Sequence, residues 1–285
     1  MNSAEYYLLD VFTDTPFSGN PLAVFLMADG LETATMQAIA NELNLAETVF
    51  LSAPIGQNHY SMRIFTPAAE LPFAGHPTVG TAQLLAELGL VNREQTLVLQ
   101  PPVGELPIRY SGKQAIFTTA RPASVTPSTL NQQTAASLLG LQSHQVIGTP
   151  VIASCGLAFH LIELSDLTAL KSIQISEAVW TDAVSPSGIE QIYLYVTETS
   201  GDSEARLRSR MFSREHGLCE DPATGSAAAA LTGYLAAHTE TSHWTIHQGV
   251  EMGRASVIET AIDKGLVQVG GCAVLVGKGE LYLQD

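Results

Sequence analysis

Glu47 is the carboxylate whose neighbours most favour acid–base chemistry. It precedes an apolar run that begins at Thr48, and Leu45, Ala46 and Val49 surround it in sequence. A carboxylate drawn into apolar surroundings loses solvation, so we expect its pKa to rise toward neutrality, where it can take and return a proton. The alternative is an ordinary glutamate in a solvated loop, and the short-range pattern leaves that alternative open.

Two further candidates lie in a passage that occurs twice. Residues 63–82 contain RIFT followed by AGHPTVGTA, and residues 210–227 contain RMFS followed by EDPATGSA. The first four residues match at an offset of 147 positions (210 minus 63), and the Pro and Gly positions match at 145 (222 minus 77), so we infer a two-residue difference in the connecting loop. This register makes His76 and Asp221 counterparts. One repeated position then carries two different titratable groups, which points to chemistry.

Each of these two residues has a functional and a structural interpretation. His76 is a general base, a hydrogen-bond donor to substrate, or only a turn residue before Pro77. Asp221 precedes a helix start, where it either takes part in proton transfer or caps the helix. Their pairing by the repeat favours function without excluding the structural roles.

The repeated turns predict two helix starts, at Gly80-Thr81 and at Gly225-Ser226. The start of a helix carries unpaired N–H groups and partial positive charge, and glycine lets a ligand come close to the backbone. Two such starts can hold a carboxylate without an arginine, with the Ser226 N–H and hydroxyl contributing. Neither copy contains the nucleotide-binding patterns GxxxxGK[ST] or GxGxxG.

The two helices that follow these turns indicate the fold. The segments 79–88 and 226–237 are apolar or small on nearly every side, which is typical of an enclosed helix. Short strand patterns surround both segments in the sequence. We therefore predict an α+β protein of two similar lobes, each a curled β-sheet or barrel around a central helix.

The limits of the lobes follow from the same pattern. Prolines and small polar residues interrupt the strands over 121–127, where we place the boundary. The N-terminal lobe is predicted to comprise 1–122 together with a C-terminal strand over 272–285, and the C-terminal lobe to comprise 123–271.

Composition excludes several classes of function. The net charge is −15 with only 13 Lys plus Arg, so there is no basic face for nucleic acid or an anionic membrane. No stretch reaches the roughly 18 to 20 apolar residues of a membrane span, and the N-terminus does not read as a secretory signal. Three cysteines without a CxxC pattern indicate free, mostly buried thiols, Cys219 among them, in a reducing compartment. We expect a cytoplasmic protein.

Metal and cofactor sites are not expected. His243 and His247 lie four apart in a strand pattern, which separates them by about 13 Å, too far to share a metal. The only lysines lie outside the repeated motifs, so a pyridoxal phosphate Schiff base is not expected. They are Lys113, Lys171, Lys264 and Lys278.

Five sequence blocks together resemble the phenazine-biosynthesis PhzF-like isomerases and epimerases, which are relatives in fold of diaminopimelate epimerase. The blocks extend along almost the whole chain and are Asp10–Val24, Leu45–Phe50, Phe65–Thr81, Phe212–Ala228 and Gln248–Ser256. One departure is Ala255, where members of the family often have proline; it concerns loop rigidity rather than chemistry.

The resemblance implies two lobes with the active site in the cleft between them, homodimers and no cofactor. In the best-understood member of the family, a single glutamate moves a proton between two carbons of a cyclic dihydro-hydroxyanthranilate, and Glu47 matches that glutamate. The other implied site residues are His76, Asp221 and Ser226 around the substrate, Gly75 and Gly225 lining the pocket, and Asn20 near the cleft.

We therefore predict a cofactor-independent isomerase that shifts a proton between carbons of a small, cyclic amino or hydroxy carboxylic acid. Glu47, His76 and Asp221 are the predicted catalytic residues, and a metal ion is not expected. One alternative is a two-base epimerase or racemase of an amino or hydroxy acid. Another is a protein that binds a small acid without turning it over.

Overall fold

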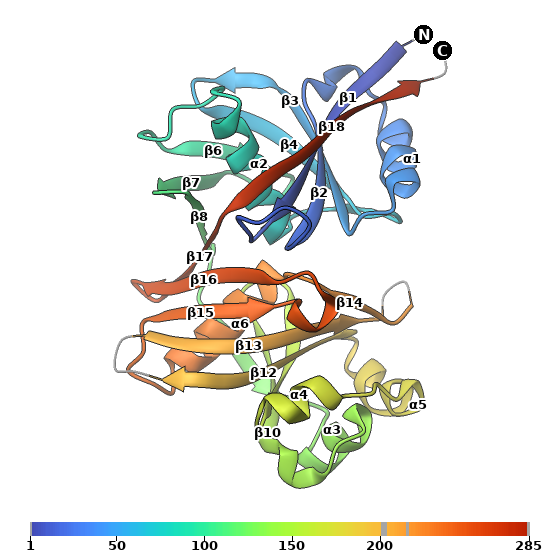
Figure 1. Ribbon diagram of the computed structural model, residues 1–285, viewed down its shortest axis with the longest axis vertical. Helices are drawn as coiled ribbons and strands as arrows, with labels where there is room; N and C mark the ends of the chain where they lie inside the picture. The colour runs from blue at the N-terminus through green and yellow to red at the C-terminus, as the bar shows by residue number, and fades with distance from the viewer. Residues whose placement is uncertain (1, 201–203, 215–216, 284–285) are drawn as a thin grey trace. The chain divides into compact units, whose positions relative to one another are not determined.

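The computed structural model describes residues 2–200, 204–214 and 217–283, and the chain divides into two compact units (Figure 1). Unit 1 comprises residues 1–118 and 270–285, and unit 2 comprises residues 119–269. Two stretches used in the sequence analysis extend beyond the described residues. These are the last two positions of the C-terminal strand, 284–285, and positions 215–216 of the fourth family block.

Unit 1 is a curled sheet in which the first and last strands of the chain pair antiparallel (Figure 1). Its order is β18–β1–β2–β3–β4–β6–β7–β8, with β5 added to β4; β2–β3 and β4–β6 are parallel. The elements are β1 (Asn2–Val11), β2 (Asn20–Phe25), α1 (Thr33–Leu43), β3 (Glu47–Gly56), β4 (His59–Phe65), β5 (Glu70–Leu71), α2 (Gly75–Glu87), β6 (Leu97–Gln100), β7 (Leu106–Ser111), β8 (Gln114–Thr118) and β18 (Ala273–Leu283).

Helix α2 is the centre of unit 1. It packs against β1, β2, β3, β6, β8 and β18, and its residues from Gly75 to Leu85 are all buried. A helix surrounded in this way has no polar face, which explains the apolar sequence of the segment. The predicted α+β class and the curled sheet around an enclosed helix are confirmed for this unit.

The predicted start of this helix is wrong. Helix α2 begins at Gly75, so Gly80 and Thr81 lie in its second turn and do not form an anion site. Pro77 falls in the first turn, where proline is tolerated because the missing N–H has no helical partner there. Gly80 instead provides space, since a Cβ on it would lie 2.5 Å from Leu22 Cδ2 and 2.7 Å from Val11 Cγ2.

Unit 2 also combines strands and helices. Its elements are β9 (Ser124–Pro127), α3 (Gln132–Leu139), β10 (Val146–Ser154), β11 (Ala158–Leu164), α4 (Leu167–Ser172), α5 (Glu177–Val179), β12 (Gln191–Ser200), β13 (Glu204–Ser213), β14 (Cys219–Asp221), α6 (Gly225–Ala236), β15 (His243–Gln248), β16 (Ser256–Asp263) and β17 (Leu266–Gly271), whose last two residues belong to unit 1. The strand order is β9–β10–β11–β12–β13–β15–β16–β17, with β14 added to β13. The pairs β11–β12 and β13–β15 are parallel.

Helix α6 is the counterpart of α2 in unit 2. It packs against β9, β10, β11 and β16, and seven of its first eight residues are buried. Small side chains allow this contact, as at Gly233, where a Cβ would lie 2.3 Å from Ala123 Cβ. The predicted helix over 226–237 is therefore confirmed to within one residue.

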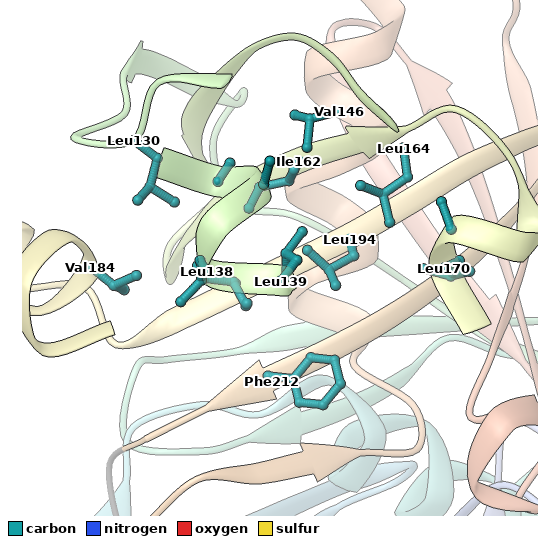
Figure 2. Close-up of a cluster of buried hydrophobic side chains, with 14 of the residues drawn as sticks. Leu130, Leu138, Leu139, Val146, Ile162, Leu164, Leu170, Val184, Leu194 and Phe212 are labelled. Atoms are coloured by element: carbon teal, nitrogen blue, oxygen red, sulfur yellow. The ribbon is translucent and has the colours of Figure 1, made fainter. Parts of the chain in front are cut away.

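A cluster of buried hydrophobic side chains joins the helices of unit 2 to its strands (Figure 2). Helix α3 contributes Leu138 and Leu139, which meet Ile162 and Leu194 from the strands. The helix has clear end signals: the Asn131 side chain accepts from the Thr134 N–H, and a left-handed glycine follows its last residue.

The two units repeat one substructure in detail. In β4 Arg63 donates to both oxygens of Glu70 in β5, and in β13 Arg210 does the same with Glu220 in β14, at 2.6 to 2.7 Å. These arginines are 147 positions apart, but the glutamates and the helix starts are 150 apart (220 minus 70; 225 minus 75). The loop difference is therefore three residues, not two, and the inferred pairing of His76 with Asp221 is wrong.

Two further observations concern membranes and thiols. Over the described ranges, none of the helices combines the length and apolar character needed to cross a bilayer. The expectation of mostly buried thiols is wrong: Cys219 is exposed, and Cys155 and Cys272 are half-buried. Cys219 begins β14, a three-residue strand that pairs with β13 and leaves this first side chain in solvent.

Candidate active site

Three predicted residues come together in unit 1 because of how its elements begin. Asn20 is the first residue of β2, Glu47 is the first residue of β3, and His76 lies in the first turn of α2. Strands β2 and β3 are parallel neighbours, with Leu22 opposite Glu47. Two strand starts and one helix start therefore meet at one edge of the sheet.

The imidazole of His76 is the centre of this cluster. Its Nδ1 lies 3.4 Å from a Glu47 carboxylate oxygen and 3.4 Å from the Asn20 amide nitrogen. The Glu47 side chain is 17% exposed, whereas that of His76 is 5% exposed. Nε2 of His76 is buried without a hydrogen-bond partner, which is unusual for a buried polar atom.

Burial determines the charge of this histidine. Loss of solvation lowers the pKa of His76 from 6.5 to about 3, and a hydrogen bond with the Pro21 carbonyl opposes that effect only in part. The ring is therefore neutral at physiological pH. A neutral ring offers one donor and one acceptor nitrogen.

A strained turn delivers Asn20 to the cluster. The nearly buried Asp10 carboxylate accepts from the Phe17 N–H at 2.6 Å, and Phe17 and Gly19 both have positive φ. A side chain at Gly19 would overlap the Val11 carbonyl oxygen at 2.3 Å, so glycine is required there. The turn that ends at Gly19 thus fixes the backbone so that Asn20, the first residue of β2, lies in the cluster.

The unit 2 candidates lie along one strand-to-helix turn. Asp221 ends β14, and Gly225 and Ser226 begin α6. Gly225 is buried, whereas Asp221 and Ser226 are partly exposed. Asp221 is not the helix cap; that position belongs to Thr224, whose hydroxyl donates to the Asp221 carboxylate.

Both motif helices begin without a side-chain cap. The residue before α2 is Ala74, which has no side chain able to cap, and Thr224 makes no capping bond to α6. The first N–H groups of a helix have no intrahelical partner. At Gly75 in unit 1 and at Gly225 and Ser226 in unit 2, these groups suit an anionic ligand.

Sequence reasoning missed the side chains that support the second turn. Gln248, at the end of β15, is fully buried and bonds to both Asp221 and Thr224, and the buried Tyr193 bonds to Gln248. Gln248 opens a block that resembles the family, which was a usable signal. Tyr193 lies in an apolar strand and gave none.

A hollow elsewhere in unit 1 has a different lining. Its volume is about 650 Å³, and it is lined mainly by apolar residues such as Tyr60, Leu85 and Leu90. None of the predicted site residues is among those lining it.

Comparison with known proteins identifies the family. Residues 9–279 match the phenazine biosynthesis-like protein family, PhzC-PhzF, and the chain belongs to it. An uncharacterized isomerase of Pasteurella multocida is 37% identical over 98% of this chain and 94% of its own length. Trans-2,3-dihydro-3-hydroxyanthranilate isomerase of Pseudomonas fluorescens is 33% identical over 98% of this chain and 99% of its own.

A solved structure agrees with the fold. The PhzF-family phenazine biosynthesis protein of Bacillus anthracis superimposes with a TM-score of 0.88, covering 99% of this chain and 100% of its own, at 24% identity. The chain is thus an enzyme of the isomerase and epimerase class within the PhzF family.

Proposed function

We propose that this enzyme moves a proton between two carbons of a small, cyclic amino or hydroxy carboxylic acid, with Glu47 as the proton carrier. The observation that supports it most is the Glu47 carboxylate, 3.4 Å from a buried, neutral histidine, in a chain similar to two proteins that are named isomerases. Trans-2,3-dihydro-3-hydroxyanthranilate, named for the Pseudomonas relative, is the first substrate to test.

In this proposal Glu47 acts twice. The ionised carboxylate takes a proton from one carbon of the ring, and the resulting acid returns it to another carbon. The neutral His76 holds the carboxylate from one side. General acid–base catalysis of this kind contributes about 10²–10⁴-fold, so positioning must supply the rest.

The remaining predicted residues bind the substrate in this proposal. The uncapped start of α6, at Gly225 and Ser226, holds the substrate carboxylate, and Gly75 lets it approach the start of α2. Asn20 lies beside the same His76 nitrogen, 3.4 Å away, and helps to enclose the ring. Asp221 accepts from the amine or hydroxyl group. The homodimer implied by the resemblance belongs to the same proposal.

Replacing Glu47 with Gln tests the proton carrier. The amide keeps the shape of the side chain but does not act as a base, so turnover in deuterated water should fall by at least about 10²-fold. Turnover and the position of the incorporated deuterium are followed by ¹H NMR with trans-2,3-dihydro-3-hydroxyanthranilate.

Glu42→Gln is the matched control, because it makes the same change at an exposed position of α1. It should keep wild-type turnover. Undiminished deuterium uptake by Glu47→Gln would reject the role of Glu47. If the wild type leaves this compound unchanged, the substrate assignment is wrong.

A further inference from the structure

A buried chain of hydrogen bonds lies beneath the turn that carries Asp221. Gln248 is 0% exposed. Its Oε1 accepts from the Thr224 backbone N–H at 3.2 Å, and its Nε2 donates to the Asp221 carbonyl at 2.8 Å. A backbone N–H only donates and a carbonyl only accepts, so these two bonds fix which end of the amide is oxygen.

The fixed amide in turn sets the direction of the Thr224 hydroxyl. Nε2 of Gln248 donates to Thr224 Oγ1 at 2.9 Å, so this oxygen accepts from one side. Its single hydrogen then points to Asp221 Oδ2, 2.5 Å away. Asp221 thus receives a hydrogen bond whose direction is determined by Gln248.

The hydrogen bonds at the other end of this network also have defined directions. The Tyr193 hydroxyl donates to Gln248 Oε1 at 3.0 Å and is 2.9 Å from the Ser209 hydroxyl. Because Tyr193 has one hydrogen, Ser209 donates to Tyr193. Hydrogen bonds aligned in this way polarise one another. Tyr193, Ser209 and Gln248 are all fully buried, and only the Asp221 end of the chain reaches the surface.

The position of Thr224 shows that this arrangement does not serve the helix. Thr224 is the residue before α6, where a threonine hydroxyl normally accepts from an N–H of the first turn and stabilises the helix. Here it makes no such bond and turns to Asp221. A stabilising cap is absent, and the first N–H groups of α6 are left for another partner.

We propose that Thr224 and Gln248 are positioning residues that hold the Asp221 carboxylate as a fixed acceptor for an amine or hydroxyl group of the substrate. This proposal rests on the proposed function only in naming the substrate as the donor to Asp221. The geometry around Asp221 itself does not depend on it.

Thr224→Val tests this role, because it removes the hydroxyl while keeping the branched shape. Loss of a hydrogen bond to the charged form should raise the titration midpoint of the Asp221 carboxyl by about one pH unit. It is measured by ¹³C NMR of aspartate-labelled, substrate-free enzyme, with the Asp221 signal assigned through Asp221→Asn. Thr224→Ser should restore the wild-type midpoint, and Tyr193→Phe should shift it in the same direction by less.

Kinetics give the second readout. The acid limb of kcat/KM for trans-2,3-dihydro-3-hydroxyanthranilate should move to higher pH in Thr224→Val, with KM raised about tenfold. An unchanged midpoint in folded Thr224→Val overturns the proposal. A changed midpoint without any wild-type turnover leaves the positioning of Asp221 intact and instead rejects that compound as substrate.

Discussion

His76 and Glu47 are close neighbours with different exposure. The histidine side chain is only 5% exposed, whereas the glutamate side chain keeps 17% of its surface in solvent. Enclosure disfavours the charged ring, so the histidine remains neutral while its neighbour retains contact with water. A neutral ring favours neither the ionised nor the protonated form of Glu47 strongly. This suits a carboxyl group that must alternate between these two forms.

The titration of His76 tests this description directly. With a pKa of about 3, the ring should keep the ¹⁵N signals of a neutral imidazole from pH 8 down to about pH 4. Long-range ¹H–¹⁵N NMR measures this, and His76→Asn assigns the signals. A midpoint near 6.5 would show that the ring is hydrated and would contradict the buried site.

The sequence predicts single residues well only when the cause is local. Glu47 stands beside apolar residues that enter the same strand, so its partial burial was foreseeable. The approach of His76 to Glu47 depends on the pairing of β2 with β3 and on the packing of α2, which join distant segments. Cys219 shows the opposite failure, since a short strand left an apolar residue exposed.

At the scale of elements, the turn after β15 supports the Asp221 turn through its backbone. Gly249 and Gly253 enclose a short 3-10 turn, and both have φ near +70°. A Cβ at Gly249 would lie 2.5 Å from the carbonyl oxygens of Pro222 and Arg254, whereas a Cβ at Gly253 would meet nothing within 4 Å. Only the first glycine is needed for a close backbone contact.

Alanine substitutions should separate these two effects. Gly253→Ala introduces only left-handed strain, so it should lower the free energy of unfolding by about 1–2 kcal/mol. Gly249→Ala adds overlap with two backbone segments and should cost at least about 3 kcal/mol. Urea unfolding measures both. Equal losses would show that the backbone around Pro222 yields easily.

Helix and strand types were largely predictable, but helix starts were not. The apolar segments located α2 and α6. The start of α2 was misplaced because Pro77 reads as a turn residue although it fits the first turn of a helix. Gly80 reads as a helix start, yet it reflects close packing against β1 and β2, which only the tertiary structure reveals.

At the scale of the whole molecule, the repeat was visible in the sequence but its register was not. Identical letters aligned the Pro-Gly pairs, while the structure aligns Glu70 with Glu220 and Gly75 with Gly225. In each unit an arginine also lies over a phenylalanine ring two residues later, at 5.0 Å. The ion pairs and helix starts therefore define which residues of the two units are equivalent. Chance sequence matches in a loop do not.

Among the residues that the structure describes, each unit also contains one buried histidine, and together they make folding sensitive to acid. Burial lowers the pKa of His76 to about 3 and that of His160, which lies between Ser128 and Ser187, to about 4. Below about pH 6.5 the unfolded chain binds protons at these rings and the folded chain does not. Stability is therefore complete above pH 6.5 and falls as the pH drops toward 4, by up to about 1.4 kcal/mol per pH unit for each ring.

His160→Asn should remove one of these two contributions. Both tryptophans, Trp180 and Trp244, lie in unit 2, so urea unfolding followed by their fluorescence reports on the unit that contains His160. Between pH 6 and 4.5 the free energy of unfolding of the variant should fall less steeply with decreasing pH than that of the wild type. The difference in slope should correspond to about one bound proton, even if the variant is less stable at every pH. His144→Asn, the same change at an exposed position of unit 2, should keep the wild-type slope. Parallel slopes for His160→Asn and the wild type would mean that the ring is protonated equally in the folded and unfolded states. That result would contradict the description of His160 as buried and neutral.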